Sequence, residues 1–404
     1  MTWKTTTFGE VVKLEQGLAF NKKNNYLIVD VGIPLLRITD LINKSESKFV
    51  DRNKVPLKFL SKPSDIIFTR TGQVGLVFKG RVGIVHNNCF RIIPIEGIDP
   101  NYVYWFLKQP AVIEYAQNLA GGVAQPDLAH DAFKSIPFRY PQYPDQQKIA
   151  AVLSAYDDLI ENNTRRIKML EEMAQAIYRE WFINFRFPGQ EDVRMVESEL
   201  GLVPVGWEVR KLGDIAEEVR RNVEPNNLDS DTPYFGLEHI PRKSIALSDW
   251  GFAKDVQSTK HQFFKGEILF GKIRPYFHKV GVAPVDGVCS SDAIVIRPKK
   301  LEYFGLVLFC VSSEQFVSHA TQTSQGTKMP RANWNVLVNY PVIIPPKPLL
   351  DKFNNVSSDM VDLIITKIFQ NANLRSTRDL LLPKLIRGEI DVSGLDIRIP
   401  EAEA

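Results

Sequence analysis

The sequence predicts an α+β fold in which two similar mixed domains are separated by two long antiparallel helices that pair as a coiled coil. Two observations carry this prediction. The chain repeats itself at an offset of 204 residues, the step from Trp3 to Trp207, and each half ends in a stretch whose apolar residues follow heptad spacing. A length of 404 residues is enough for two or three domains with cores of their own.

The repeat is carried mainly by residues that set turns. Glycine and proline relax or restrict φ and so fix the path of the chain, which predicts the same fold twice as an internal pseudo-two-fold repeat. The side chains between these points differ, which suggests two related surfaces that read different things; the alternative is an old duplication without a present use. The matching pairs include Gly9 and Gly213, Gly83 and Gly287, Pro94 and Pro298, Gly122 and Gly326, Pro126 and Pro330, and Pro137 and Pro341.

Each half begins with a mixed segment, which we place at residues 1–143 and 206–346. Short apolar runs between Gly, Pro and Asn turns predict strands. One buried helix is expected in each segment, at Tyr102–Leu107 and Tyr303–Phe309. The expected strands are Leu35–Ile38, Asp65–Phe68 and Phe90–Pro94 in the first segment, and Tyr234–Leu237, Glu267–Phe270 and Ile294–Pro298 in the second.

Residues 144–188 predict the first long helix, which a linker at 189–205 connects to the second domain. Asp145 is the expected N-cap, and Pro188 with Gly189 should end the helix. Apolar residues at spacings of three and four form a seam for the partner helix, interrupted by one polar residue, Asn163. The seam residues are Ile149, Leu153, Tyr156, Ile160, Asn163, Ile167, Leu170 and Ile177.

Residues 347–390 predict the second long helix, followed by a C-terminal tail at 391–404. Its seam holds Met360, Ile364, Leu374, Leu381 and Leu385, interrupted by Ser357, Lys367, Asn371 and Arg378. Pro383 should kink this helix or end it early. A long helix must cover its apolar stripe, and the other copy is the obvious partner; the alternative is that each helix packs only on its own domain.

Composition places the chain among ordinary globular proteins. The net charge is +3, and no apolar run is long enough for a signal peptide or a membrane span, so we expect a cytoplasmic protein. Cys89, Cys289 and Cys310 lack metal-binding spacing and are expected to be buried thiols, without a metal site.

Motifs for catalysis are missing from the sequence. We find neither a Walker-type phosphate loop nor a dinucleotide fingerprint, and Pro345-Pro346 lacks the preceding Asn or Asp of an amino-methyltransferase. The pair Asp157-Asp158 is best interpreted as a solvated helix face. We therefore predict no catalytic residues, although a self-contained nuclease or methyltransferase remains an alternative.

Three pairs of loops at matching places offer binding groups instead. Arg, Lys, Gln and Thr are the side chains that hydrogen-bond base edges and phosphates, and each pair differs between the halves. The alternative for each loop is an ordinary polar surface. The candidate residues are Arg70, Thr71 and Gln73 against Lys272, Arg274, Tyr276 and Lys279; Gln125 against Lys328 and Arg331; and Lys22 and Lys23 against Arg220 and Arg221.

Pro144–Leu153 with Asp157–Glu161 is similar to the central helix of the specificity subunits of type I restriction–modification systems, and Asp379–Ile390 to the end of the distal helix of that family. Trp181–Pro188, Val205–Glu208 and Lys211–Asp214 are similar to the passage into its second target-recognition domain. The resemblance spans nearly the whole chain.

The resemblance implies a non-catalytic DNA-binding subunit whose two target-recognition domains, at 1–143 and 206–346, each read one half of a bipartite site in double-stranded DNA. The helices would space the domains and dock two methylation subunits, and restriction subunits would join the complex. S-adenosylmethionine, ATP and Mg would be bound by those partners, and no cofactor is expected in this chain. Alternatives are a recognition subunit of a related system that cuts on both sides of its site, and a coiled-coil scaffold that binds no DNA.

If the helices act as a ruler, lengthening them should change the gap in the recognised site. Seven residues added to each helix preserve the heptad face and add about 10 Å at about 1.5 Å per residue. Since DNA rises about 3.4 Å per base pair, the gap should grow by roughly three base pairs while both half-sites stay the same. Site selection with the complex that contains the methylation subunits measures the gap; an unchanged gap would contradict the ruler.

Overall fold

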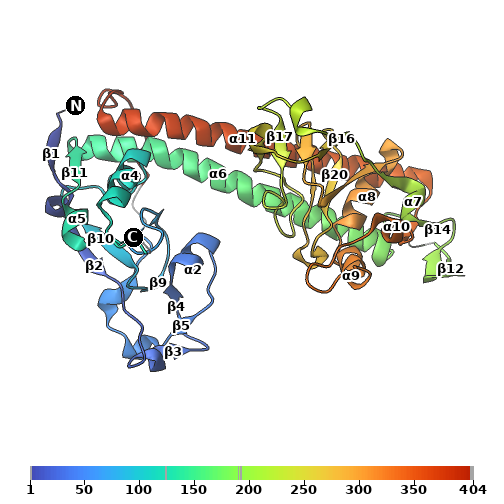
Figure 1. The fold of residues 1–404 in the computed structure, drawn as a ribbon, viewed down its shortest axis with the longest axis horizontal. Coiled ribbons are helices and arrows are strands. Elements are labelled where there is room, and N and C mark those ends of the chain that lie inside the picture. The colour runs from blue at the N-terminus through green and yellow to red at the C-terminus, as the bar shows by residue number, and fades with distance from the viewer. Residues whose placement is uncertain (1, 123–124, 190, 192, 401–404) are drawn as a thin grey trace. The chain divides into compact units, whose positions relative to one another are not determined.

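The computed structural model describes residues 2–122, 125–189, 191 and 193–400 (Figure 1). The chain divides into two compact units. Unit 1 comprises Met1–Leu159 with Leu374–Ala404, and unit 2 comprises Ile160–Asn373. Each unit therefore contains one mixed domain and one segment of each long helix.

Unit 1 contains two sheets and a strand pair. A four-stranded antiparallel sheet has the order β2 (Val12–Gln16), β10 (Cys89–Pro94), β7 (Ile66–Thr69), β8 (Val77–Phe78). A five-stranded sheet has the order β3 (Ile28–Val29), β5 (Phe49–Val50), β4 (Ile33–Leu36), β9 (Gly83–Val85), β6 (Leu60–Ser61), in which β4 and β9 are parallel. β1 (Lys4–Thr7) pairs with β11 (Pro137–Tyr140).

Short helices cover the four-stranded sheet and complete its core. They are α1 (Phe8–Val11), α3 (Pro100–Leu107), α4 (Pro110–Leu119) and α5 (His130–Lys134), while α2 (Ile38–Asn43) follows β4. α3 begins where Asp99 accepts a hydrogen bond from Tyr102 N at 2.8 Å and proline occupies the first turn, which favours a helix start. Phe8, Phe68 and Phe133 meet in the fully buried core, with centroids 4.5–5.2 Å apart for the pairs that share Phe133.

Unit 2 repeats this arrangement. Its four-stranded sheet has the order β15 (Ala216–Glu218), β23 (Ala293–Pro298), β20 (Ile268–Gly271), β21 (Val280–Val282). The five-stranded sheet has the order β16 (Asn222–Val223), β19 (Lys260–Phe263), β22 (Gly287–Cys289), β17 (Pro233–Phe235), β18 (Gly251–Phe252), and β14 (Glu208–Lys211) pairs with β24 (Pro341–Ile344). Helices α7 (Leu212–Ile215), α8 (Phe304–Val311), α9 (Glu314–Gln322) and α10 (Trp334–Leu337) complete it.

The predicted α+β repeat is confirmed. The six expected strands and both buried helices are present, with ends that differ by at most two residues. The expected linker at 189–205 contains a hairpin of its own, β12 (Met195–Ser198) with β13 (Gly201–Pro204), in which Gly201 has a φ of 93°. Gln190 and Asp192 of that linker lie outside the described residues. Cys89, Cys289 and Cys310 are free and buried, and burial raises the pKa of each thiol to about 12.

The two long helices are α6 (Tyr143–Tyr178) and α11 (Lys347–Arg387), and both differ from the prediction at their ends. α6 begins at Tyr143, so Asp145 lies in the first turn and is not the N-cap. It passes into a π-helical turn at Arg179–Ile183 and ends well before Pro188. α11 continues through Pro383 to Arg387, and a left-handed Gly388 with φ of 75° then ends it.

In each unit the two helices run antiparallel. In unit 2, Asn163 Nδ2 donates to Asn371 Oδ1 at 3.0 Å, while the ring of Phe182, beyond the end of α6, lies 4.7 Å from that of Phe353, near the start of α11. In unit 1, Ile149 and Leu153 share a core with Leu382, Leu385 and Ile386. Two of the polar interruptions of the predicted seam are therefore helix contacts themselves: Asn371 bonds to Asn163 in unit 2, and Arg378 to Asp157 in unit 1.

Most of the predicted seam faces inward. Ile149, Leu153, Ile160, Asn163, Ile167, Ile364 and Leu385 are buried, and Tyr156, Leu170, Ile177, Met360, Leu374 and Leu381 are half-buried. The prediction missed Val361, Ile365 and Ile368, which are buried in unit 2 because the packed face of α11 lies beside the expected heptad positions.

Asp157 does not belong to a solvated face, contrary to the prediction. Its carboxylate accepts a hydrogen bond from Arg378 Nη1 of α11 and lies 3.3 Å from Lys108 Nζ. Burial opposes the charge of Arg378, yet its hydrogen bonds to Asp157 and Asp379 raise the pKa of the guanidinium. At the equivalent positions of the other half stand Val361, Ala174 and Ser312, so this ion pair belongs to unit 1 alone.

The segment after α11 packs against unit 1. Val392 is 1% exposed, and Lys148 Nζ donates to the carbonyl oxygen of Ser393 at 2.8 Å. Residues 391–400 of the predicted tail are therefore part of the domain edge, and residues 401–404 lie outside the described part of the chain.

Replacing Asp157 by alanine should destabilise the protein, because it leaves the guanidinium of Arg378, 16% exposed, without its main partner. Breaking a partly buried ion pair of this kind should lower the free energy of unfolding by about 1–3 kcal/mol. Glu161→Ala is the control, since its pair with Arg165 lies on an exposed surface and should contribute less than about 0.5 kcal/mol. Denaturant unfolding measures both; equal losses would contradict this account.

Candidate nucleic-acid interface

Two loops of unit 2 form one surface beyond the end of β20. The segment Lys272–His278 follows β20 and lies beside the segment Gln325–Arg331. Ala332 N donates to the carbonyl oxygen of Lys272 at 2.8 Å, and Arg274 N donates to that of Pro330 at 2.7 Å. Arg274 adopts a left-handed φ of 49°, a backbone region that non-glycine residues rarely occupy and that often marks functional loops.

Three of the predicted cations line one hollow beside these loops. Arg220, Lys272 and Arg331 come from three different parts of the sequence and surround a hollow of about 430 Å³, together with Glu218, Gln325 and Asn333. Arg220 forms an ion pair with Glu218 at 2.6 Å, and Arg331 lies 3.6 Å from Asp292. Within the described part of the chain, Lys272 has no ion pair. The hollow therefore combines an excess of positive charge with amide groups, the chemistry that suits phosphates and base edges.

The corresponding loops of unit 1 are joined in the same way but carry different chemistry. Leu128 N donates to the carbonyl oxygen of Arg70 at 2.9 Å, as Ala332 N does to Lys272. The Arg70 guanidinium lies 2.6 Å from the carboxylate of Asp127, and Thr71 Oγ1 donates to the same carboxylate at 2.5 Å. The side chain of Arg70 is 12% exposed and lies 5.3 Å from the centroid of Phe90. Arg70 and Thr71 therefore hold the two loops together.

In each unit the two loops joined by backbone hydrogen bonds form a loop frame, with Arg70 and Asp127 in unit 1 and Lys272 and Arg331 in unit 2. The charge of one residue of this frame is reversed between the units. Arg70 corresponds to Lys272 because each accepts the hydrogen bond from the second loop, and the offset of 204 residues aligns Asp127 with Arg331. The first frame is an internal ion pair with no net charge, whereas the second has two cations, one of which, Arg331, lies 3.6 Å from the carboxylate of Asp292. Unit 1 has a hollow of about 540 Å³ at a different place, lined by Gln73 and Gln117 beside Gly72 and Pro126 and by the apolar side chains of Ile42, Val74 and Leu76. The same backbone arrangement thus carries a neutral ion pair in one copy and cations in the other.

The other predicted residues divide into exposed and internally engaged groups. Lys22, Lys23, Gln125, Tyr276 and Lys328 are exposed, and Gln125 follows Val123 and Ala124, which lie outside the described residues. Arg221 instead forms two hydrogen bonds with Glu267, at 2.7 and 2.9 Å. Lys279 Nζ donates to the carbonyl oxygen of Leu237, and burial lowers the pKa of Lys279.

The structure does not gather all three loop pairs in both units. In unit 2, Arg220 joins the hollow with Lys272 and Arg331. In unit 1, Lys22 and Lys23 precede β3 of the five-stranded sheet, whereas Arg70 follows β7 of the four-stranded sheet. Direct DNA contact by any of these side chains stays a prediction.

The residues predicted from the sequence did not include Asp127, Asp292, Gln117 and Asn333, which line these surfaces or pair with their cations. Asp127 could have been found, because the repeat aligns it with Arg331 and so exposes a reversal of charge. Gln117 could not, since only the fold brings α4 next to the loop after β7: Gln117 Nε2 donates to the carbonyl oxygen of Val74 at 3.0 Å.

The described residues contain neither a cluster of metal-binding side chains nor a helix that could span a membrane. No group of three or more His, Cys, Asp or Glu side chains is arranged to hold a metal ion. No helix among them is long and apolar enough to cross a membrane.

A loop frame built twice, with different hydrogen-bonding groups in each copy and long paired helices beside it, defines a two-domain recognition protein. The sequence profile described as "Type I restriction modification DNA specificity domain" matches residues 1–172 and 204–356. The chain belongs to this family of specificity subunits, which are non-catalytic, and the resemblance inferred from the helix motifs is confirmed.

The chain is similar to two specificity subunits and to one solved structure along most of its length. It is 29% identical over 341 residues to the type I restriction enzyme MjaIX specificity subunit of Methanocaldococcus jannaschii, covering 82% of this chain and 78% of that protein. It is 24% identical over 368 residues to the EcoDI specificity subunit of Escherichia coli, covering 86% and 78%. The crystal structure of the type I S subunit from M. genitalium has the same fold, with a TM-score of 0.60, 14% identity, and coverage of 95% and 96%.

Alanine substitutions in the basic hollow should weaken DNA binding. Loss of Lys272 or Arg331 removes about 1–3 kcal/mol of discrimination at one position if the side chain binds a base; if it binds a phosphate, affinity falls for all sequences and the salt dependence becomes less steep. Arg297→Ala is the control, since this exposed arginine lies at the other end of β23 and pairs with Glu217. Titration of DNA duplexes across a salt series separates these results; unchanged binding by both variants would place the hollow away from DNA.

Proposed function

We propose that each of the two domains reads one part of a bipartite DNA site through the loop frame beyond its four-stranded sheet. The observation that carries the proposal is the repeated frame, with Arg70 and Asp127 in one copy and Lys272 and Arg331 in the other. A backbone kept constant while its side chains change suits two readers that share a docking mode and differ in sequence preference.

The two surfaces would read DNA in different ways. In the second domain, the cations around the hollow suit phosphates and the acceptor edge of guanine. In the first domain, Gln73 is exposed and carries the amide that pairs with both donor and acceptor groups of adenine. Arg70 and Arg221 would act as internal braces, since each holds a carboxylate of its own unit.

We further propose that the long helices dock two methylation subunits. Leu159 is 52% exposed on α6 and Leu363 49% exposed on α11, at positions related by the repeat. Met169 and Met173, one turn apart on α6, are also about half exposed. Apolar side chains left exposed on the outside of a paired helix are typical of an interface with a further protein. The repeated leucine supports one docking place for each of two subunits.

In such a complex the chemistry would belong to the partners. Methylation subunits would bind S-adenosylmethionine, and restriction subunits would bind ATP and Mg. The contribution of this chain would be to hold them on a chosen sequence, which requires shape and charge at the loops and no reacting group.

Exchange of residues 1–143 for those of another specificity subunit tests the proposal. One half of the methylated sequence should change while the other half and the gap stay the same, because the second loop frame is untouched. Methylome sequencing of cells that carry the complete system reads out both halves.

The reciprocal exchange of residues 206–346 is the control and should change the other half alone. Two halves that change together would contradict separate reading. A complex that methylates the same sequence after both exchanges would leave only a scaffold function for the chain.

A further inference from the structure

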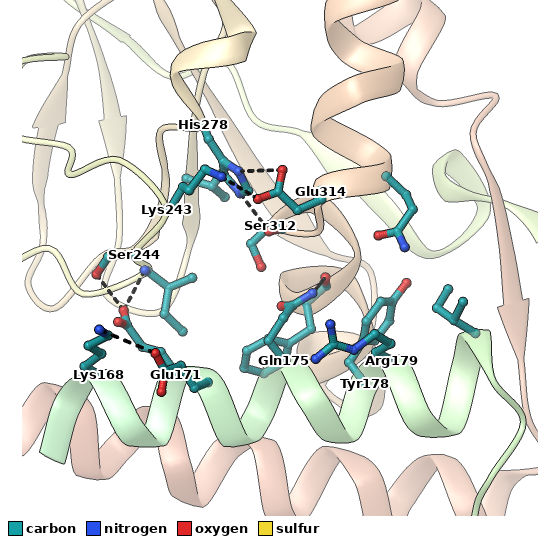
Figure 2. A pocket seen from close by; sticks show the side chains of 16 residues that line it. Lys168, Glu171, Gln175, Tyr178, Arg179, Lys243, Ser244, His278, Ser312 and Glu314 are labelled. Atoms are coloured by element: carbon teal, nitrogen blue, oxygen red, sulfur yellow. Dashed lines mark hydrogen bonds and ion pairs between the residues drawn. The ribbon is translucent and has the colours of Figure 1, made fainter. Parts of the chain in front are cut away.

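The last turns of α6 line a cavity of about 290 Å³ in unit 2 (Figure 2). Its walls come from α6, from the segment that begins at Lys243, and from His278 and the start of α9. Figure 2 shows Glu171 of α6 pointing toward Ser244 at one side of this cavity, and His278 with Lys243 and Glu314 at the other. His278 ends the loop that begins with Lys272.

Glu171 anchors the segment Ser244–Ala246 to the helix. Its Oε1 accepts three hydrogen bonds, from Ser244 Oγ at 2.6 Å, Ile245 N at 2.8 Å and Ala246 N at 3.0 Å. Burial raises the pKa of Glu171, while these hydrogen bonds favour its charged form. One side chain thus satisfies two consecutive backbone donors that the sheet does not use.

The anchored segment in turn holds the end of the DNA-reading loop. Lys243 N donates to the carbonyl oxygen of His278 at 2.8 Å, and Val282 N donates to that of Ile245 at 3.0 Å. The guanidinium of Arg242 lies 4.1 Å from the centroid of Phe277, inside the loop.

His278 itself is held on a second side. Its Nε2 lies 2.9 Å from the carbonyl oxygen of Ser312, and its backbone adopts a left-handed φ of 51°. Lys243 is left-handed as well, with a φ of 55°. Lys243 and His278, which are joined by a backbone hydrogen bond, thus both adopt a conformation that persists only where neighbouring contacts fix it. Glu171 links these contacts to the long helix α6.

We propose that Glu171 is a positioning residue for DNA recognition: through Ser244–Ala246 and Lys243 it fixes the Lys272–His278 loop, and so sets how sharply the second domain discriminates its half of the site. The inference rests on the proposed function of that loop. It also predicts an asymmetry, because the equivalent position of the other long helix holds Arg375, an exposed cation in place of the carboxylate.

The test compares Glu171→Ala with Glu171→Gln in the complex with the methylation subunits. The recognised site is first determined for the unaltered protein by methylome sequencing, and affinity is then measured on duplexes with single base changes in each half. Glu171→Ala should reduce discrimination in the half read by the second domain roughly fivefold or more, about the contribution of one base contact, and leave the other half unchanged. Glu171→Gln keeps the acceptor oxygen and should retain most of the discrimination.

Two further variants make the test specific. Ser244→Ala removes one of the three hydrogen bonds and should act in the same direction more weakly, which keeps the proposal open to test if Glu171→Ala does not fold. Glu172→Ala removes a neighbouring exposed carboxylate and should have no effect.

The possible failures are distinguishable. If methylome sequencing finds no bipartite recognition site for the unaltered protein, the proposed function itself is overturned. With such a site established, full discrimination in Glu171→Ala, or equal losses in both halves, would overturn the positioning role. A Glu171→Gln variant as impaired as Glu171→Ala would overturn the hydrogen-bond mechanism.

Discussion

The need to cover the apolar face of a 36-residue helix governs the rest of this structure. In both units α11 covers α6, and polar pairs within the contact determine which residues meet. The Asn163–Asn371 hydrogen bond has no equal substitute if the helices slip, because a buried amide would then lose its partner. The pair Asp157–Arg378 adds the same requirement in unit 1. Residues that weaken the apolar seam therefore help to specify the register.

The repeat supplies a second constraint, on the backbone of the reading loops. In both domains the residue that follows the central strand accepts a hydrogen bond from a loop more than 50 residues later in the chain, at Leu128 and Ala332. Because these bonds involve only the backbone, side chains at the joint can change without loss of the frame. The exchange of Asp127 for Arg331 is such a change, and it alters the surface while the path of the chain stays the same.

Much of the fold could be predicted from the sequence, because turn residues and heptad spacing report local geometry. Six of the strands, the two buried helices and most seam positions followed from these patterns. The ends of the long helices did not: α11 passes Pro383, although proline usually breaks a helix, because packing of Leu382, Leu385 and Ile386 continues around it. The side-chain pairs also could not be predicted from the sequence, because Asp157 contacts Lys108 and Arg378 only after folding.

The candidate site was predictable in its place but not in its chemistry. The loops were predicted as separate candidates, and in unit 2 the structure brings Arg220, Lys272 and Arg331 to one hollow. Arg70, Arg221 and Lys279 are instead engaged inside the protein. A cation in a sequence does not reveal whether a carboxylate lies within reach. Asp127 lies 57 residues from Arg70 in the chain and 2.6 Å from it in the fold. Such pairing decides which of two similar loops presents charge.

The neutral pair in the first loop frame and the two cations in the second imply unequal responses to ionic strength. Each phosphate that a lysine or arginine neutralises releases condensed counterions, and added salt reverses that gain. A domain that contacts DNA through amides loses little affinity as the salt concentration rises, whereas a domain that contacts DNA through a basic hollow loses more. As salt rises, the second domain would loosen first, and the complex would be held on its target increasingly by the half that carries Gln73.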